Sequence, residues 1–374
     1  MSGKSKGKPI GIGAVIAIVV GVVVALQQGV QEKSNPGGQD AAVRPAGPAS
    51  VQPRDVRGPD PDFGSTREAP AAHVPDTTKP DTTVRIGAWN IEWLGKPSER
   101  SGLGQGTAQA VDDLVDYIIA ARVSLLAVEE IIGRPAADGP RSPELDAVVS
   151  QLKSRTGQVW RYELFPGRSD DAQLTGLMWD GGVATPLDRA GKPEKGDPTP
   201  TKLPVKSGKS TQGSGLWNRP PHAMYFSLGS GKTDLVLIVV HMKADYQGDF
   251  AAHRDEEAKT LVDALPGVRK TFSDQDVVVL GDTNMTRPDE AAGRTFVGSG
   301  MHDLNRKAET THWRGGATDR IFVPEAQSEF AERKFEVMSD QYLEAKRWDP
   351  RDFKRGLSDH YMVVTTIRVM EDDD

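Results

Sequence analysis

The sequence has 374 residues with 46 basic and 53 acidic side chains, which gives a formal net charge of −7, and it contains no cysteine. The absence of cysteine excludes disulfide bonds, thiolate zinc sites, iron–sulfur clusters and cysteine nucleophiles, so a bound metal must be held by oxygen or imidazole. The acidic balance argues against a surface coated with basic residues for nonspecific nucleic-acid binding. It does not exclude an enzyme that meets phosphate through a metal and a few local cations.

The N-terminal residues have the features of a membrane-targeting segment. Three lysines, Lys4, Lys6 and Lys8, precede an uninterrupted apolar run over residues 10–26. About 17–25 apolar residues span a bilayer, and flanking lysines favour the cytoplasmic side. The run is longer than the apolar region of a signal peptide, and a poor cleavage site follows it. We therefore predict a single-pass transmembrane signal-anchor over residues 1–30 with the domain outside the cytoplasm; the alternative is a cleaved signal peptide and a secreted protein.

Residues 31–83 have the composition of a linker. They contain nine of the 26 prolines and hardly any large apolar residue. Such a segment cannot bury enough apolar surface to offset the entropy lost on ordering, so we predict a disordered tether. From residue 84 onward, strand-like and helix-like patterns alternate to the C-terminus, which predicts one large α/β domain over residues 84–374.

Hydrophobic periodicity predicts the elements of this domain. Alternating or continuous apolar runs predict strands, and apolar residues spaced three and four apart predict helices. Ser142 is typical of a helix N-cap, and the helix after it is predicted to run to residue 152. Residues 185–218, rich in glycine, proline and lysine, are predicted to be a surface insertion. The other predicted helices are 107–121 and 252–265, and the predicted strands are 84–89, 124–128, 161–165, 176–179, 222–227, 234–241, 277–280, 320–323 and 361–369.

Polar side chains adjoin the ends of several predicted strands. In α/β folds, ligand sites gather at one end of the strands, on loops held by a rigid scaffold. Oxygen donors suit hard cations such as Mg²⁺, and histidines beside carboxylates supply acid–base groups. The set therefore fits metal-assisted attack of water on a phosphoester. Its members are Asn90, Glu92, Glu129, Glu130, His241, Asp282, Asn284, Asp319, Asp359 and His360.

Six short motifs resemble those of the endonuclease/exonuclease/phosphatase superfamily, which includes deoxyribonuclease I-like and exonuclease III-like enzymes, neutral sphingomyelinases and inositol-phosphate phosphatases. They occur in the superfamily's order over residues 84–369. Glu129 stands where the superfamily usually has glutamine, and Val239 where it usually has asparagine. The resemblance implies a four-layer α/β sandwich, two mixed sheets flanked by helices. The motifs are Ala-Trp-Asn-Ile-Glu-Trp at 88–93, Leu-Ala-Val-Glu-Glu-Ile at 126–131, Val-Val-His-Met-Lys at 239–243, Gly-Asp-Thr-Asn at 281–284, Thr-Asp-Arg-Ile at 318–321 and Ser-Asp-His at 358–360.

The resemblance also implies a metal site and a phosphate contact. Glu130 is then the principal ligand of Mg²⁺, with Mn²⁺ as the alternative ion. Asn90, Glu92 and Asp359 complete the metal-binding set. Arg219, in the sequence Arg-Pro-Pro, resembles an arginine that contacts substrate phosphate in some members.

The catalytic roles follow from the same resemblance. Asp282 and Asn284 position the attacking water and a nonbridging oxygen. His241 stabilises the negative charge that develops on the phosphate. Asp319 orients His360, and the two residues act as a dyad.

We predict a Mg²⁺-dependent phosphodiester hydrolase that acts on nucleic acid. The alternatives are a phosphomonoesterase or a sphingomyelinase-like lipid phosphodiesterase of the same superfamily, and a catalytically retired binding module on the surface. Outside the insertion, the cations beside the motifs are Arg219, Lys243 and Arg320, which are few for a highly charged inositol phosphate. The membrane is the other predicted partner, through the N-terminal helix, and the sequence indicates no protein partner.

Overall fold

The computed structural model describes residues 82–167, 173–196, 198–205, 215–245, 248–287 and 289–372. The predicted signal-anchor over residues 1–30 and residues 31–81 of the predicted linker lie outside these residues, and the last two residues of the predicted linker begin the first strand instead. Among the helices that the structure describes, none combines the length and apolar character needed to cross a bilayer. Within the part of the chain that the structure describes, this finding contradicts the predicted single-pass membrane localisation.

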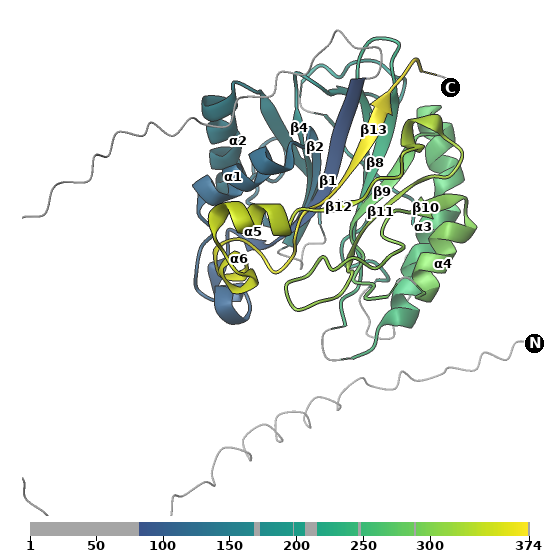
Figure 1. Ribbon diagram of the computed structural model, residues 1–374. Coiled ribbons are helices and arrows are strands. Elements are labelled where there is room, and N and C mark those ends of the chain that lie inside the picture. Colours follow the sequence, from purple (N-terminus) through teal and green to yellow (C-terminus); the bar gives the residue numbers. More distant parts are fainter. Residues whose placement is uncertain are drawn as a thin grey trace, which may run out of the picture. The chain divides into compact units, whose positions relative to one another are not determined.

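The first sheet has the strand order β12-β13-β1-β2-β4-β3. Its strands β1 and β2 run parallel to each other, and the other neighbours are antiparallel. The C-terminal strand β13 therefore pairs with the first strand of the domain, as Figure 1 shows. The strands are β1 Thr82–Leu94, β2 Leu125–Ile132, β3 Trp160–Leu164, β4 Gln173–Asp180, β12 Glu336–Val337 and β13 Val363–Val369.

The second sheet has the order β10-β11-β9-β8-β7-β5, and β6 also pairs with β7. Its strands β8 and β9 are parallel. Each sheet thus places a parallel pair among antiparallel neighbours, which makes both sheets mixed. The strands are β5 Thr185–Leu187, β6 Thr201–Lys202, β7 His222–Ser227, β8 Asp234–His241, β9 Val277–Asp282, β10 Met301–Asp303 and β11 Asp319–Pro324.

Strand β8 illustrates why the aliphatic runs are continuous. Leu237 and Val239 belong to the core between the two sheets, whereas Ile238 and Val240 pack in the core shared with α3 and α4. Because successive side chains point to opposite faces, a strand with both faces buried must be apolar at every position.

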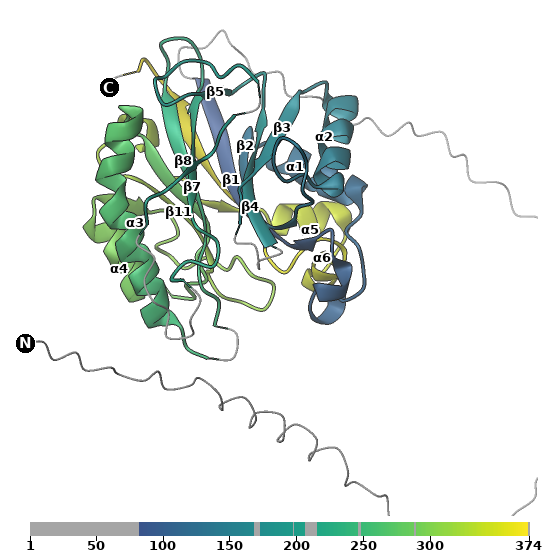
Figure 2. The same cartoon turned by 180° about the vertical axis from the view of Figure 1, so that it is seen from behind.

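Helices cover the outer face of each sheet (Figures 1 and 2), so three hydrophobic cores separate four layers. This arrangement confirms the predicted fold class for the domain. The helices on the first sheet are α1 Val111–Ala121, α2 Pro143–Thr156, α5 Asp340–Lys346 and α6 Pro350–Gly356, and those on the second are α3 Ala251–Phe272 and α4 Ala291–Gly298.

The predicted insertion over residues 185–218 is partly wrong, because β5 and β6 within it pair with β7 and extend the second sheet. Residues 197 and 206–214 of this segment lie outside the described part of the chain. Helix α3 also runs past its predicted end, through Pro266 to Phe272. A proline inside a helix removes one backbone hydrogen bond, and burial of Val268 and Phe272 in the core offsets that cost.

Candidate functional site

Strand register brings the predicted site residues from both sheets together. Asn90 on β1 lies opposite Glu129 on the parallel strand β2. In the second sheet, His241 at the end of β8 lies opposite Asp282 at the end of β9, and Asp282 is paired with Asp319 on β11. The strand ends therefore supply a cluster of polar groups along one edge of the two-sheet core.

Asp319 and His360 form a buried dyad. The Nδ1 atom of His360 lies 2.9 Å from Oδ2 and 3.2 Å from Oδ1 of Asp319. Thr318 donates its hydroxyl to Asp319 Oδ2 at 2.9 Å, and the Asp319 side chain is fully buried. The carboxylate therefore fixes the imidazole so that its Nε2 atom faces Asp282 Oδ2 at 3.8 Å and Asp359 Oδ1 at 3.9 Å.

Asn90 connects the two sheets at this point. Its side-chain amide lies 3.1 Å from Glu130 Oε1 and 3.1 Å from Asp282 Oδ2, so it donates to one carboxylate of each sheet. Its side-chain oxygen Oδ1 accepts from the backbone N–H of Glu92 at 3.0 Å. Every polar group of this buried asparagine thus has a partner, and Glu130 and Asp282 are held near each other.

Irregular backbone aims the side chains of the first sheet. The register between β1 and β2 shifts after Asn90, and that between β2 and β4 shifts after Val128. Glu130 lies in the β2 irregularity with φ 60°, and Glu92 lies in the β1 irregularity with φ 45°. Such bulges re-aim side chains, and non-glycine residues with positive φ cluster at functional sites.

His241 and Asn284 complete the predicted catalytic set. The Nε2 atom of His241 lies 3.6 Å from Asp282 Oδ2 and 3.8 Å from Glu130 Oε1. The backbone N–H of Asn284 donates to Asp282 Oδ1 at 2.9 Å, and its side-chain amide donates to the Met242 carbonyl at 3.1 Å. Asn284 therefore ties the end of β8 to the loop after β9.

Arg219 lies close enough to the cluster to act on it electrostatically. Its guanidinium donates to the side chain of Gln173 on β4. Its charge lowers the pKa of both Glu130 and His241, although burial is the larger influence on each. The position fits the predicted phosphate contact.

The structure does not bring Glu92 into the metal-binding set. Its Oε2 atom accepts from Arg100 at 3.1 Å, and its Oε1 atom accepts from the backbone N–H of Ser101 at 3.0 Å and from the Lys354 ammonium. Arg100 and Lys354 are themselves fully buried, so the carboxylate already has cationic partners. Glu92 instead reaches the site indirectly, because Lys354 also lies 3.5 Å from Asp359 Oδ2.

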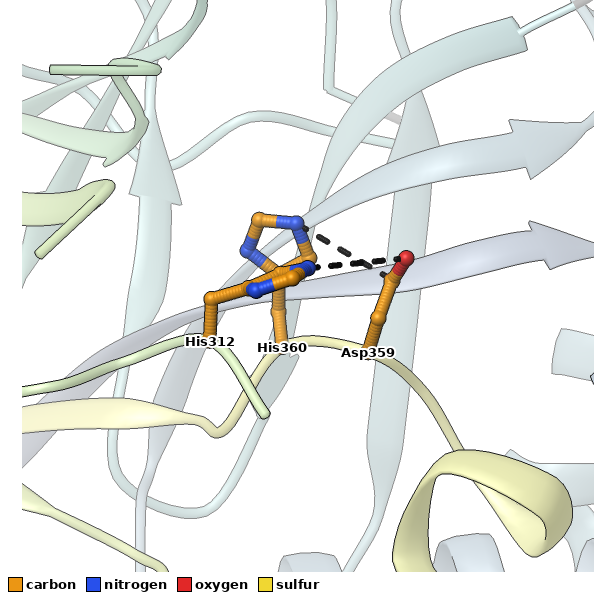
Figure 3. A group of neighbouring side chains, drawn as sticks. All are labelled: His312, Asp359 and His360. Atoms are coloured by element: carbon orange, nitrogen blue, oxygen red, sulfur yellow. Dashed lines mark ion pairs between the residues drawn. The ribbon is translucent and has the colours of Figure 1, made fainter. Parts of the chain in front are cut away.

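His312 and Lys354 are site residues that sequence reasoning missed. Figure 3 shows His312 beside Asp359 and His360, with His312 Nε2 at 3.9 Å from Asp359 Oδ2. Both residues lie in segments without a recognised motif, and nothing in their sequence context predicts proximity to the cluster. For His312, the tripeptide Thr-His-Trp just before the Thr-Asp-Arg-Ile motif is the only signal that could have been weighed.

No protein-family model matches the sequence, and no curated protein matches it. Solved structures do match the fold. An endonuclease/exonuclease/phosphatase family protein from Bacteroides thetaiotaomicron superposes with a TM-score of 0.50 at 14% identity, over 79% of this chain and 99% of that one. The chain has the endonuclease/exonuclease/phosphatase fold.

Two further structures resemble the chain. A protein of the same description from Bacteroides vulgatus has a TM-score of 0.49 at 15% identity, over 78% of this chain and 100% of that one. The human Nocturnin catalytic domain, with a bound sulfate anion, has a TM-score of 0.48 at 16% identity, over 77% and 94%. At these identities the likeness concerns the fold, so the activity must be argued from the site.

Burial is the first influence on the protonation of this cluster. It raises the pKa of Glu130 to about 7, with the Asp359 carboxylate adding to the effect, and it raises the pKa of Asp282 to about 6. Burial opposes the charged form of His360, yet Asp319 and Asp282 hold its pKa well above the usual range. Burial, Arg219 and His360 lower the pKa of His241. At neutral pH His360 is therefore cationic and His241 is neutral.

The donor set fits a hard divalent cation. Among the described residues, two groups place three donor atoms within 4.8 Å of one another, and these are Asp282 with Asp319 and His360, and His312 with Asp359 and His360. In the first group, Asp319 and His360 are already bonded to each other. Glu130 is in neither group; burial raises its pKa, the Asp359 carboxylate adds to the effect, and a cation beside it would favour its ionised form. Carboxylate oxygens at this density suit Mg²⁺ or Mn²⁺.

Glu129 lies directly beneath the cluster without a hydrogen bond. Among the described residues, neither of its buried carboxyl oxygens has a partner. Burial raises the pKa of Glu129 well above its usual range, and Asp319 and Asp282 add to the effect, so the fold favours the neutral form of this carboxyl. Gly281 is required beside it, because φ is 137° there and a Cβ atom would lie 2.1 Å from the Val240 carbonyl and 2.8 Å from Glu129 Oε1.

Glu129→Gln is expected to raise thermal stability increasingly as pH rises. A carboxyl whose pKa is raised on folding contributes stability below its unfolded pKa, and that stability is lost as pH rises toward the folded value. Glutamine cannot ionise, so the variant avoids the loss. Thermal unfolding in chelator should show little difference from the wild type near pH 4 and a gain of a few degrees near pH 8. The exposed Glu344→Gln on α5 is the control, and a gain independent of pH would contradict the assignment.

Proposed function

We propose that this chain hydrolyses phosphodiester bonds with the aid of a divalent metal and that its substrate is nucleic acid. The observation that carries the proposal is the buried dyad of Asp319 and His360. The Nε2 atom of His360 faces Asp282, which accepts a hydrogen bond from Asn90. Asn90 also donates to Glu130. Hydrolysis of a phosphoester needs three elements: a positioned acid, a positioned base and a group of carboxylates that binds a metal cation. The fold, which accommodates such enzymes, is consistent with it.

Glu130 and Asp359 would hold the metal, with Asn90 orienting Glu130 through its 3.1 Å hydrogen bond. The bound cation would supply Lewis-acid stabilisation of the phosphate and lower the pKa of bound water. Lys354 limits the negative charge of the set, because its ammonium lies 3.5 Å from Asp359 Oδ2. The two carboxylates that would hold the metal are therefore positioned by Asn90, which also bonds to Asp282, and by Lys354, which also pairs with Glu92.

Asp282 is placed to accept a proton from the attacking water. Its two oxygens are fixed by the Asn284 backbone and the Asn90 amide, at 2.9 Å and 3.1 Å. A pKa of about 6 leaves it mostly ionised at pH 7 but more basic than an ordinary carboxylate. The cationic His360 donates Nε2–H to a phosphate oxygen, and His241 Nε2 lies 3.6 Å from the same Asp282 oxygen that His360 Nε2 faces. Both histidines then stabilise charge that develops on the phosphate.

The cations around the cluster favour a diester over a highly charged monoester. Arg320 is fully buried and paired with Asp303, and Lys354 is fully buried and paired with Glu92. This removes both from the surface that a substrate contacts. Among the described cations named beside the motifs, Arg219 and Lys243 then remain, and the Lys243 ammonium lies over the Phe250 ring at 4.6 Å from its centroid. This equipment suits a strand gripped at one or two phosphates.

The full chain with Mg²⁺ is expected to nick supercoiled plasmid DNA or degrade RNA with little sequence preference. A grip on about two phosphates predicts that the rate falls roughly tenfold between about 50 and 200 mM salt under subsaturating conditions. Gel assays over this salt range measure nucleic-acid cleavage and its salt dependence. Phosphate release from sugar and inositol phosphates, and choline-phosphate release from sphingomyelin, test the alternative substrates. Asp282→Asn is the inactive control. Phosphate release from the small esters with untouched nucleic acid would overturn the nuclease assignment.

A further inference from the structure

His312 is an additional imidazole at the edge of the cluster. Its Nε2 atom lies 3.9 Å from Asp359 Oδ2, and its ring meets that of His360 edge-on with centroids 5.1 Å apart. Figure 3 shows both rings turned toward Asp359. The side chain of His312 is 22% exposed, against 9% for His360 and 4% for His241. A substrate that approaches from solvent therefore meets His312 before the two deeper histidines.

The backbone fixes this ring to the segment that carries Asp359 and His360. His312 and His360 form an antiparallel bridge. The Tyr361 N–H donates to the Thr311 carbonyl at 2.7 Å, and the Trp313 N–H donates to the Asp359 carbonyl at 2.9 Å. Trp313 also packs against the core of the first sheet. His312 is therefore part of the rigid framework of the site.

One hydrogen bond determines which ring nitrogen carries the proton. The Arg314 backbone N–H donates to His312 Nδ1 at 3.2 Å, so Nδ1 presents its lone pair and the proton resides on Nε2. The Nε2–H group points toward Asp359, but 3.9 Å is too long for a hydrogen bond. The Nε2 atoms of His360 and His241 lie at similar distances from Asp282 Oδ2, at 3.8 and 3.6 Å. At these distances the Nε2–H groups of His312 and the cationic His360 remain available to an oxygen of a bound molecule.

This tautomer decides between two roles for His312. A metal ligand needs a lone pair on the nitrogen that faces the ion, and Nε2 has none while Nδ1 accepts from Arg314. A donor, in contrast, suits an anionic oxygen. We propose that His312 donates a hydrogen bond from Nε2 to an oxygen of the substrate's phosphate group, beside the donors of His241 and His360. The proposal rests on the proposed function of the site.

Two substitutions at position 312 isolate the donor. His312→Phe keeps a ring of similar size and removes the N–H, whereas His312→Gln retains a donor near the position of Nε2. With bis(4-nitrophenyl) phosphate and with plasmid DNA, we expect His312→Phe to lower kcat/KM by about tenfold or more, as loss of one positioned donor does. His312→Gln should recover most of it, and the Mg²⁺ concentration for half-maximal rate should stay unchanged. His302→Phe on β10, where the imidazole pairs with Glu325 outside the cluster, is the control.

A readout without turnover separates failure of this inference from failure of the proposed function. In the full chain with ¹⁵N-labelled histidine, the signals lost in His312→Phe should show the Nε2–H tautomer, and inorganic phosphate should shift them. Wild-type kinetics in His312→Phe while Asp282→Asn is inactive would overturn the inference alone. A raised Mg²⁺ requirement with normal kcat would make His312 a metal ligand and overturn it too. If the wild type cleaves no phosphoester, an Nε2 signal that phosphate leaves unmoved would overturn it independently.

Discussion

Replacing His360 with alanine is expected to lower kcat by roughly a hundredfold or more while the fold persists. The ring is buried and cationic because Asp319 and Asp282 raise its pKa, so its removal deletes the charged donor that faces the phosphate. Asp282→Asn should cost a similar factor, since asparagine keeps the hydrogen-bond partners of Asp282 but cannot accept the proton. Steady-state kinetics at saturating Mg²⁺, with circular dichroism to verify folding, measure both losses.

Asp319→Ala should resemble His360→Ala, because the carboxylate acts through the imidazole at 2.9 Å. The double variant should then be little slower than either single variant, since residues that act as one unit are not additive. Asp303→Asn is the control for loss of a buried charge. Asp303 is a neighbouring buried carboxylate, and it pairs with Arg320 and not with His360. Losses that multiply in the Asp319 and His360 double variant would refute the dyad.

Removal of the metal is expected to abolish activity, and Mg²⁺ or Mn²⁺ should restore it. Glu130→Gln should raise the Mg²⁺ concentration for half-maximal rate by at least about tenfold, the loss typical of disturbing even an outer ligand partner. The physical reason is that glutamine keeps an acceptor for the Asn90 amide but removes the charge that the cation neutralises. Because a ligand stabilises the state that binds it, the Mg²⁺-induced rise in melting temperature should shrink in the same variant.

Protons compete with the metal at this carboxylate, so the Mg²⁺-induced rise in melting temperature should be larger at pH 8 than at pH 6. The pKa of Glu130 is raised to about 7 without metal, and only the ionised form binds a cation. Glu344→Gln, which alters an exposed carboxylate, should leave the response unchanged. Full activity after exhaustive chelation would contradict a metal-dependent mechanism.

Much of the fold follows from the sequence, because strands buried on both faces must be continuously apolar. The predicted strands 222–227 and 234–241 agree with β7 and β8 to the residue. The short elements were not predicted: α5 and α6 have seven residues each, and Tyr342 and Phe353 bury them by packing against the distant Tyr117 of α1. Such contacts are fixed by tertiary structure, and periodicity over seven residues is too short to reveal them.

The site was predictable where a residue's role depends on its own strand end. His241, Asp282 and Asp319 come together because the register of adjacent strands requires it. Glu92 shares the first motif with Asn90 but turns toward Arg100 and Lys354, because the β1 irregularity redirects the chain after Asn90. The partners of Glu92 come from a 3₁₀ turn and from α6, so no local pattern could have revealed them.

Hydrolysis in ¹⁸O-labelled water tests the central claim most directly. The full chain with Mg²⁺, acting on bis(4-nitrophenyl) phosphate and on plasmid DNA, should release products whose phosphate carries one ¹⁸O atom, because water attacks phosphorus. Asp282→Asn should form labelled product at least about a hundredfold more slowly under the same conditions. Absence of labelled phosphate from the wild type, or label incorporation that persists undiminished in Asp282→Asn, would contradict phosphoester hydrolysis at this cluster.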